Sequence, residues 1–554
     1  MPKVKNFSAG WLVVWAVFLA LGWLLPNHYR PWTSFHSEVW VAFALITVVP
    51  WMVFRAPPKF SCDAFVVSVL AAAVVPFVQL AFGQIYYFGH AWINSLYLLG
   101  LLIAILTGYC WERSDTGRLI DMLCFAIGLA SLLSVFFQFY QWLDLDSLGI
   151  WLCESDTARP AANLGQPNQL ATLLLWGVLS TFWAWLRSRI GVATAVLLAL
   201  FLLFGVALTG SRTAWLGVGF VIAAGWWWRG IWNSKYVSWV LSTLGFYFAV
   251  CVAVLNFLGQ QNRLAQMAAS PTDARLAAWQ LLVKAVLESP IFGYGWNQTA
   301  SAHILFSEEN PALHVVFGQA HNLFLDLILW CGLPVGGLLS WAILSRFWRT
   351  FRQVNSPENA VLFFFLLILA NHALLEFPLH YAYFLLPAGL ILGTVIARDQ
   401  KSRQILELSR RSFAVLGVVS AIMLSITLID YLKVENSYSL LRIEWAGYKL
   451  ASNPQPPDVI ALNQWHHIIK HARIIPRAGM SESELEEMRQ ITLLAHKPVD
   501  FRVLASALAL NGRQAESELW LKRLCKVESV QNCEENGVSL ERKRDQTRHS
   551  LLLP

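Results

Sequence analysis

Two arginines and one histidine are the residues of this chain whose type and position best suit chemistry on a charged molecule. Arg212 and Arg275 each stand beside apolar runs, and His321 is followed by Asn322 and Asp326 at the start of another apolar run. A guanidinium presents a planar fork of donors that matches phosphate oxygens. A neutral imidazole accepts a proton near pH 7. These residue types indicate an anion clamp formed by the arginines and a general base formed by the histidine.

Each of these residues also has a purely structural interpretation. Arg212 could extend to lipid headgroups, and Arg275 could form an ordinary salt bridge with Asp273 or Glu288. A lone histidine is more often a satisfied structural residue than a catalyst. Position favours His321, because it ends the longest polar connection of the chain. The remaining histidines of this kind are weaker candidates by position: His303, His314, His372 and His380.

Two polar turns supply further candidates for substrate binding. The first ends in Gln166, Asn168 and Gln169, whose amides can bind sugar hydroxyls or hold the turn itself. The second, residues 376–384, contains a carboxylate, a histidine and two tyrosines, including Tyr381. We expect Gln166, Asn168, Gln169, Asn322 and Tyr381 to position a substrate. We expect the site to need no metal and no other cofactor.

The composition defines what must hold these residues in place. Of 554 residues, 56% are hydrophobic and 14% are charged, with a mean hydropathy of +0.51, whereas a soluble domain carries about 25% charged residues. The 27 tryptophans suit the headgroup level of a bilayer. The sequence therefore predicts an all-α polytopic membrane protein. The net charge of +7 does not indicate a nucleic-acid partner.

Thirteen apolar runs are candidate membrane helices, and several of them are shorter than the roughly 17–25 residues that a spanning helix needs. They are residues 11–26, 40–54, 64–82, 91–110, 119–141, 169–186, 190–208, 214–228, 236–258, 320–345, 359–376, 381–397 and 412–432.

The distribution of Lys and Arg predicts how these helices are oriented. Lys3 and Lys5 place the N-terminus in the cytoplasm by the positive-inside rule. Every second connection is then basic, at 55–59, 113–118, 187–189, 229–235, 346–352 and 398–411. An odd number of helices places residues 433–554 outside, in the periplasm. The long connections 142–168 and 259–319 are predicted on the same side.

The segment from residue 433 onward is predicted to be a separate helical domain. Its residues 503–516 form a small-apolar helix face, an Asn-Gly turn and a new helix start, as in one tetratricopeptide-like hairpin. A generic helical domain fits equally well. Cys525 and Cys533 could form a disulfide if this segment lies in an oxidising compartment. No cysteine pair has the spacing of a metal site.

Together, these segments resemble the bacterial protein O-oligosaccharyltransferase family (PglL type), within the O-antigen ligase and polymerase superfamily. The resemblance covers most of the chain and depends on the order of its motifs. These are Asn163 to Thr172, Gly210-Ser211-Arg212 with Trp215, Arg275 with Trp279, His321-Asn322 with Gly332, and Glu376 to Phe384. The last motif favours the protein-glycosylating branch.

The resemblance implies a fold, a reaction and a location. The fold is like that of GT-C glycosyltransferases, with residues 1–432 as the transmembrane catalytic domain and residues 433–554 as a periplasmic domain. The donor is an undecaprenyl-diphosphate-linked oligosaccharide, and the acceptor is a Ser or Thr hydroxyl of a periplasmic protein such as a pilin. Arg212 and Arg275 hold the pyrophosphate, and His321 serves the acceptor hydroxyl. The location is the bacterial inner membrane.

Three other functions were weighed. An O-antigen ligase or a glycan polymerase would use the same arginines and histidine with another acceptor. A flippase or transporter would line a path with polar groups at mid-membrane depth, whereas the polar clusters here lie at the ends of the runs. A membrane-anchored scaffold would not require thirteen membrane helices.

Overall fold

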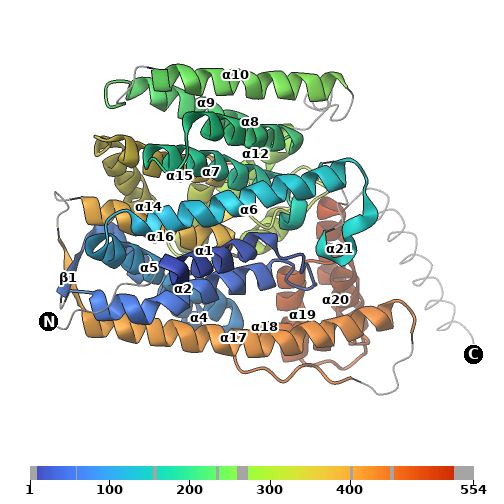
Figure 1. The fold of residues 1–554 in the computed structure, drawn as a ribbon. Helices are drawn as coiled ribbons and strands as arrows, with labels where there is room; N and C mark the ends of the chain where they lie inside the picture. Colours follow the sequence, from blue (N-terminus) through green and yellow to red (C-terminus); the bar gives the residue numbers. More distant parts are fainter. Residues whose placement is uncertain are drawn as a thin grey trace, which may run out of the picture. The chain divides into compact units, whose positions relative to one another are not determined.

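The computed structural model describes residues 9–57, 59–153, 159–232, 236–258, 272–399, 404–448 and 454–528, and these residues are mostly helical (Figure 1). Its helices are α1 (Ala9–Leu24), α2 (Phe35–Arg55), α3 (Ala64–Ala72), α4 (Val75–Ala81), α5 (Phe88–Ser114), α6 (Arg118–Trp142), α7 (Pro167–Leu186), α8 (Val192–Leu208), α9 (Arg212–Trp227), α10 (Tyr236–Phe257), α12 (Thr272–Glu288), α13 (Thr299–Phe306), α14 (Leu323–Arg352), α15 (Pro357–Ala373), α16 (Ala382–Arg398), α17 (Arg410–Trp445), α18 (Asn463–His471), α19 (Glu482–Ala495), α20 (Pro498–Leu510) and α21 (Gln514–Val527). Short 3-10 helices lie at η1 (Asp146–Trp151), η2 (Ala162–Leu164) and η3 (Pro378–His380). Strands β1 (Lys59–Cys62) and β2 (Leu406–Ser409) pair antiparallel.

The chain forms two compact units. The first comprises residues 1–74, 95–270 and 341–429, and the second comprises residues 75–94, 271–340 and 430–554. A helix, or the pair α3 and α4, lies over each of the thirteen apolar runs. The sequence did not predict the break between α3 and α4, the extension of α17 to Trp445 or the two strands.

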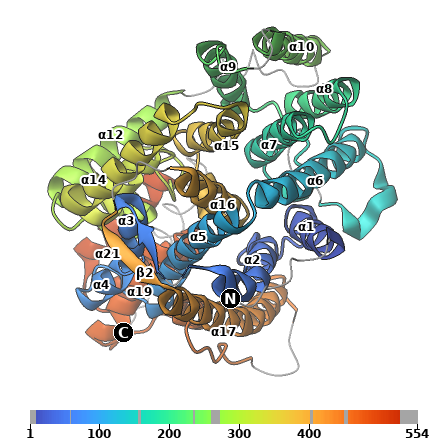
Figure 2. The same cartoon turned by 60° about the vertical axis from the view of Figure 1, so that its left-hand side comes forward.

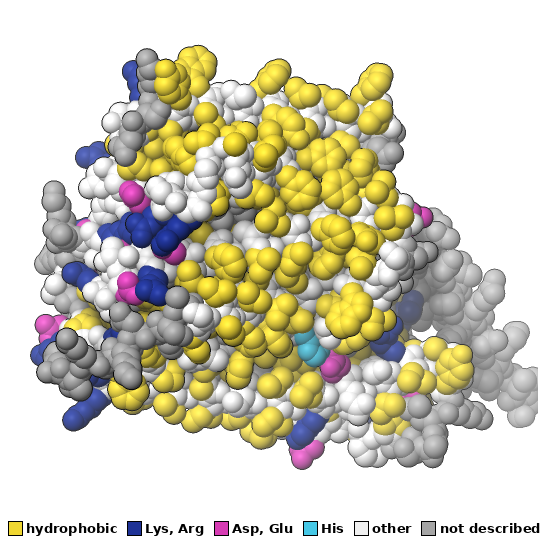
Figure 3. All heavy atoms as spheres, in the orientation of Figure 1, with side chains coloured by type: hydrophobic (Ala, Val, Ile, Leu, Met, Phe, Trp, Pro, Cys, Tyr) yellow, Lys and Arg dark blue, Asp and Glu magenta, His cyan; other side chains and the backbone are white. Residues whose placement is uncertain are grey.

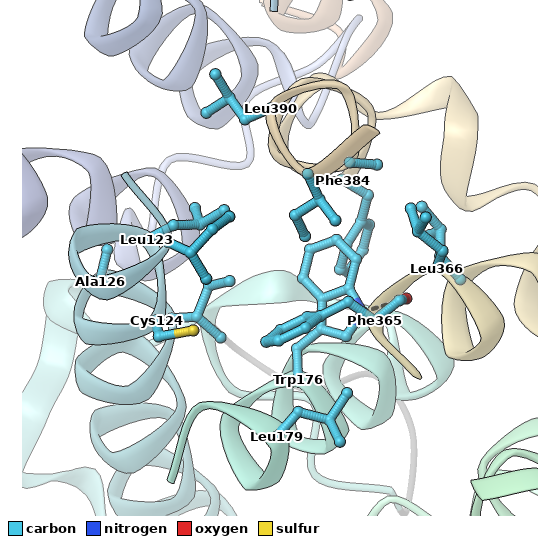
Figure 4. Packing of buried hydrophobic residues seen from close by; sticks show 14 of the residues in the cluster. Leu123, Cys124, Ala126, Trp176, Leu179, Phe365, Leu366, Phe384 and Leu390 are labelled. Atoms are coloured by element: carbon cyan, nitrogen blue, oxygen red, sulfur yellow. Dashed lines mark hydrogen bonds between the residues drawn. The ribbon is translucent and has the colours of Figure 1, made fainter. Parts of the chain in front are cut away.

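The first unit is a bundle of apolar helices. Helix α7 packs against α6, α8 and α15, and α1 packs against α6 and α2 (Figure 2). At the centre, the fully buried Trp176 of α7 contacts the rings of Phe365 and Phe384 at centroid distances of 5.7 and 5.4 Å (Figure 4). Its indole N–H donates to the Phe365 carbonyl at 3.0 Å. This hydrogen bond satisfies the one polar atom of the side chain within the apolar core.

Many outward-facing side chains of the described helices suit a lipid solvent. Eight helices are long and apolar enough to cross a membrane by length and composition: α2, α3 with α4, α5, α6, α7, α10, α14 and α17. Four shorter apolar helices, α1, α8, α15 and α16, accompany them. Figure 3 shows hydrophobic side chains spread over the face in view, with many of the Lys and Arg side chains toward the left edge. The chain is therefore a membrane protein.

The basic connections of the first unit are joined to one another. Arg346 pairs with Asp63 at 3.1 Å and with Asp399 at 3.4 Å. Arg398 pairs with Glu112 at 2.9 Å. The pairing of β1 with β2 joins the 55–59 connection to the 398–411 connection. Further ion pairs there join Arg118 to Asp115, and Arg187 and Arg189 to Asp121. The segments predicted to be cytoplasmic thus meet at the same set of helix ends.

The opposite helix ends of the first unit are joined by a different kind of bond, from side-chain amides and a guanidinium to main-chain carbonyls. The Asn163 Nδ2 group donates to the Leu24 carbonyl at 2.8 Å and to the Trp151 carbonyl at 2.9 Å. The Arg159 Nε group donates to the Thr209 carbonyl at 2.8 Å. These bonds tie the ends of α1 and α8 to the 142–166 connection.

The second unit contains a helical layer formed by α18 to α21. The side chains of Leu504, Leu508 and Trp520 form its core together with Ile304 of α13. Helix α13 also contacts α19 and α21. The C-terminal helices therefore share one hydrophobic core with a segment that precedes His321 by fewer than twenty residues.

Helix α14 is interrupted at Gly332, where φ is 72° and ψ is 172°. This region of backbone conformation is accessible almost only to glycine. The interruption frees main-chain groups, which the 289–298 segment satisfies. The Tyr294 N–H donates to the Leu329 carbonyl at 2.9 Å, and the Leu333 N–H donates to the Pro290 carbonyl at 2.7 Å. The kink and the segment packed on it thus depend on each other.

We predict that Gly332→Ala strongly destabilises the protein. A Cβ atom at this position would lie 2.2 Å from the Ile291 carbonyl oxygen, and the backbone conformation excludes it as well. The loss should be roughly 3 kcal/mol, measured as a fall in the thermal unfolding temperature in detergent. Gly337→Ala in the same helix is the control, because a Cβ there meets no atom within 4 Å. Equal unfolding temperatures for the two variants would contradict this account.

Candidate active site

Arg212 is the first residue of α9 in the first unit. The turn before it contains Gly210 at φ 56°, and Ser211 caps the helix by accepting the Ala214 N–H at 3.4 Å. The Arg212 side chain is exposed and makes no hydrogen bond or ion pair with the described residues. A helix N-terminus carries a partial positive charge that adds to the charge of the guanidinium. Arg212 is therefore available to an anionic ligand.

A polar network lies beside this turn in the first unit. Asn168 accepts a hydrogen bond from Arg159 Nη2 at 3.3 Å and donates one to Glu376 at 3.2 Å. Arg159 in turn holds the Thr209 carbonyl, at the start of the turn that leads to Arg212. The sequence did not single out Arg159, although its position next to Pro160 at the end of a polar connection is a weak signal. Asn168 is thus committed to bonds within the protein.

The predicted glutamines differ in their surroundings. Gln169 is buried and accepts a hydrogen bond from the Tyr383 hydroxyl at 2.5 Å. Gln166 is half-buried and makes no side-chain hydrogen bond with the described residues. Tyr381 stacks on Tyr383 with ring centroids 5.2 Å apart. Gln166 is therefore the least constrained of the predicted amides in the described part of the chain.

His321 lies in the second unit, two residues before α14. Its backbone is in the left-handed region, with φ 53°, which non-glycine residues rarely adopt. Hydrogen bonds hold the preceding residue, Ala320, on both sides. Its N–H donates to Asp326 Oδ1 at 2.9 Å, and its carbonyl accepts from the Trp279 indole at 2.7 Å. After His321, the Asn322 Oδ1 atom accepts the Phe324 N–H at 3.1 Å.

Arg275 belongs to the same unit as His321. It lies on α12, one helical turn before Trp279, so the two side chains share a helix face. Because Trp279 bonds to Ala320, α12 brings this face to the segment that contains His321. The structure therefore associates Arg275 with His321 in the second unit, whereas Arg212 belongs to the first unit. The Asp273 side chain, which was the alternative partner of Arg275, lies outside the described residues.

The other predicted histidines have structural bonds. The ring Nδ1 of His303 accepts the Phe317 N–H at 3.0 Å, and burial lowers the pKa of His303 to about 4. His303 is therefore neutral at pH 7. His314 Nδ1 bonds to the Glu528 carbonyl at 2.7 Å, and His372 Nδ1 bonds to the Thr172 hydroxyl at 2.8 Å. His380 packs against the ring of Phe377. Among the described residues, no group of three or more His, Cys, Asp or Glu side chains could hold a metal ion.

One buried carboxylate that the sequence reading missed lies in the first unit. Glu38 accepts hydrogen bonds from Trp32 at 3.0 Å and Ser34 at 2.5 Å, and from the Tyr97 hydroxyl and the Ala382 N–H. It also lines an apolar cavity between α2, α5, α16 and α17. Its only sequence signal is a charged residue near the start of an apolar run. Because four donors converge on it, Glu38 joins α2 to α5 and α16.

Family models and known proteins that are similar to this chain indicate its class. A family model described as O-antigen ligase matches residues 197–342, which include Arg212, Arg275 and His321. A model described as protein glycosylation ligase matches residues 160–185, and one described as virulence factor membrane-bound polymerase, C-terminal, matches residues 360–527. The General O-oligosaccharyltransferase of Acinetobacter baylyi is 30% identical over 542 residues, which cover 93% of this chain and 92% of the relative.

The chain belongs to the O-oligosaccharyltransferase family. It is thus a transferase of the O-antigen ligase superfamily, as its motifs predicted. A second relative, the ComP-specific O-oligosaccharyltransferase of the same organism, is 26% identical over 417 residues, with 72% of this chain and 73% of the relative covered.

The buried histidine gives the transferase a predictable response to acid. His303 has a pKa of about 4 when folded and about 6.5 when unfolded, so the unfolded state binds more protons between these values. Stability is complete above pH 6.5 and falls as the pH drops. The expected loss from this group is about 3 kcal/mol at pH 4.

The measurement is the unfolding temperature between pH 7 and pH 4.5 for the intact protein and for His303→Gln, which keeps an acceptor but does not titrate in this range. The variant should lose less stability on acidification. His471, which is also buried and has a pKa lowered to about 4, provides a second, independent case. His471→Gln should flatten the curve in the same way, and the double variant should flatten it most. Parallel curves for all proteins would contradict the assignment.

Proposed function

We propose that this chain transfers an oligosaccharide from an undecaprenyl-diphosphate carrier to Ser or Thr hydroxyls of proteins outside the cytoplasm. The observation that carries the proposal is the backbone at His321. It is left-handed, and hydrogen bonds hold both the N–H and the carbonyl of the preceding residue, Ala320, in the unit that also contains Arg275. Rare backbone conformations persist where the surrounding structure enforces them, and they cluster at active sites.

The reaction needs few groups, because the donor already has a good leaving group. The acceptor hydroxyl oxygen attacks C1 of the first sugar, and its proton passes to His321. The bond from C1 to the phosphate oxygen breaks, and the electron pair leaves with the pyrophosphate. Arg212 and Arg275 stabilise the charge that develops there. The free guanidinium of Arg212 supports its part in this scheme. Gln166 is the favoured amide for binding a sugar hydroxyl, and Asn322, Asn168, Gln169 and Tyr381 support the site around it.

The proposed location is the bacterial inner membrane, with the N-terminus cytoplasmic and the C-terminal domain periplasmic. Two observations support this orientation. The basic connections of the first unit meet at one set of helix ends, as the positive-inside rule requires. Cys525 is disulfide-bonded, which suits an oxidising compartment, while Cys533 lies outside the described residues. We propose thirteen spans, arranged as in GT-C glycosyltransferases. This odd number places the basic connections with the N-terminus on one side of the membrane and Cys525 on the other.

Residues 433–554 are proposed to select the acceptor protein, while residues 1–432 hold the donor. The names of the two relatives include a general and a ComP-specific enzyme, so acceptor range varies within the family. A pilin-like protein is the proposed acceptor. The contact between α20 and α21, which are joined through Asn511 and Gly512, supports the proposal of a tetratricopeptide-like hairpin.

The first test of the proposed function is the intact mass of a periplasmic pilin co-expressed with a glycan pathway and this protein. A glycan-sized mass gain is expected with the intact protein. His321→Ala should reduce it by roughly 10²–10⁴-fold, the usual contribution of a general base. Arg212→Ala and Arg275→Ala should each reduce it by about 10²–10³-fold.

The controls are a histidine of the C-terminal helical layer and an arginine on the basic side of the first unit, His466→Ala and Arg187→Ala, which should retain the mass gain. Sugar on lipid A instead of protein would move the chain to the O-antigen ligase branch, whose family model matches residues 197–342. Transfer that survives His321→Ala would exclude the histidine as base.

Acceptor selection by the C-terminal domain has its own test. Deleting the domain would expose Ile304, so we prefer a point substitution at the surface. Ile475 is 82% exposed. We predict that Ile475→Asp raises KM for an intact acceptor protein several-fold and leaves transfer to a short Ser-containing peptide unchanged. Ile475→Leu is the matched control. Equal effects on the protein and the peptide would exclude this surface as an acceptor contact.

A further inference from the structure

The left-handed conformation of His321 needs a source of free energy. A non-glycine residue in this region costs roughly 1–2 kcal/mol. The side chain of His321 contacts Phe317 edge-on, with ring centroids 5.9 Å apart, but a ring contact does not fix the main chain. Hydrogen bonds to the peptide groups of Ala320 constrain the main chain directly before His321.

A chain of three buried polar side chains provides that constraint. The indole N–H of Trp330 donates to the Thr299 hydroxyl at 2.7 Å. The Thr299 hydroxyl donates to Asp326 Oδ1 at 2.7 Å. The same oxygen accepts the Ala320 N–H at 2.9 Å. The chain thus runs from α13 and α14 to the residue before His321.

These groups are almost inaccessible to solvent. Thr299 is 0% exposed, Asp326 is 3% exposed and Ala320 is 2% exposed. A buried hydrogen bond is costly to break, because its partners have no water to replace them. The arrangement is therefore rigid on the Ala320 side, and the Trp279 indole fixes the carbonyl on the other side of the same residue.

We infer that Asp326, oriented by Thr299, is a positioning residue for the transfer reaction. It holds the Ala320 amide so that the His321 imidazole reaches the acceptor hydroxyl. This inference rests on the proposed role of His321 as base. A displacement of about 1 Å at a reacting group can lower the rate roughly 10²-fold. Breaking the chain should therefore slow the chemical step more than it weakens binding of either substrate.

The test compares isosteric variants at two points of the chain. Thr299→Val has nearly the same shape as threonine but neither donates to Asp326 nor accepts from Trp330, whereas Thr299→Ser keeps the hydroxyl. We expect Thr299→Val to lower kcat about 10–100-fold with KM for the acceptor changed less than about threefold. Thr299→Ser should restore kcat to within about threefold of the intact protein.

The second point is the carboxylate. Asp326→Asn keeps an acceptor oxygen for both donors and should retain kcat to within about threefold. Asp326→Leu has no acceptor and should lose about 100-fold. Ser307→Ala is the control for loss of a buried hydroxyl, because Ser307 donates to the Ile304 carbonyl and not to this chain. The unfolding temperature of each purified variant identifies any that do not fold. If Asp326→Leu does not fold, the comparison of Thr299→Val with Thr299→Ser tests the inference.

An unchanged kcat in folded Thr299→Val or Asp326→Leu would overturn the inference, as would an equal loss in Thr299→Val and Thr299→Ser. A loss that appears only as a higher KM would also overturn it. If the intact protein glycosylates lipid A sugars and not proteins, the proposed function fails, and the same variants are measured with the lipid acceptor. The inference and the proposed function therefore fail through different results.

Discussion

The structure depends on one constraint: in lipid, a main-chain N–H or carbonyl group has no water to bond with and must find a partner inside the protein. Regular helices meet this requirement alone. At several helix ends and breaks among the described residues, another segment supplies the missing bonds. Asn163 serves the end of α1, the 289–298 segment serves the kink at Gly332, and Asp326 and Trp279 serve the segment before α14. The proposed site residues Arg212 and His321 lie beside helix ends, where a polar side chain can be both held and accessible.

The two units meet this constraint in different ways. In the first, charged side chains join the helix ends on the basic side, and amide or guanidinium groups bond to carbonyls on the other side. In the second, buried hydroxyl, carboxylate and indole groups form a connected chain around Thr299. The shared core of α13 with α19, α20 and α21 explains why the C-terminal helices belong to the same compact unit as His321.

Much of this organisation could be predicted from the sequence, because apolar runs and basic connections follow directly from solvation in lipid. Arg212, Arg275 and His321 could be selected because ionisable residues beside apolar runs are rare. The roles of Asn163, His303 and Glu38 could not, because each depends on a partner more than ten residues away in the chain. The break at Gly332 also looks like ordinary helix in the sequence, since a single glycine is tolerated there. The committed bonds of Asn168 and Gln169 likewise depend on tertiary contacts.

The left-handed backbone at His321 has a consequence for the evolution of the enzyme. Glycine and asparagine occupy this conformation more readily than histidine does, so His321 lowers the stability of its own loop. Random substitution toward either residue would relieve strain while removing the proposed base. Selection for stability and selection for activity therefore oppose each other at this position. Homologues that have lost the reaction but kept the fold should accumulate glycine or asparagine there, and such a residue would mark an inactive descendant in a genome.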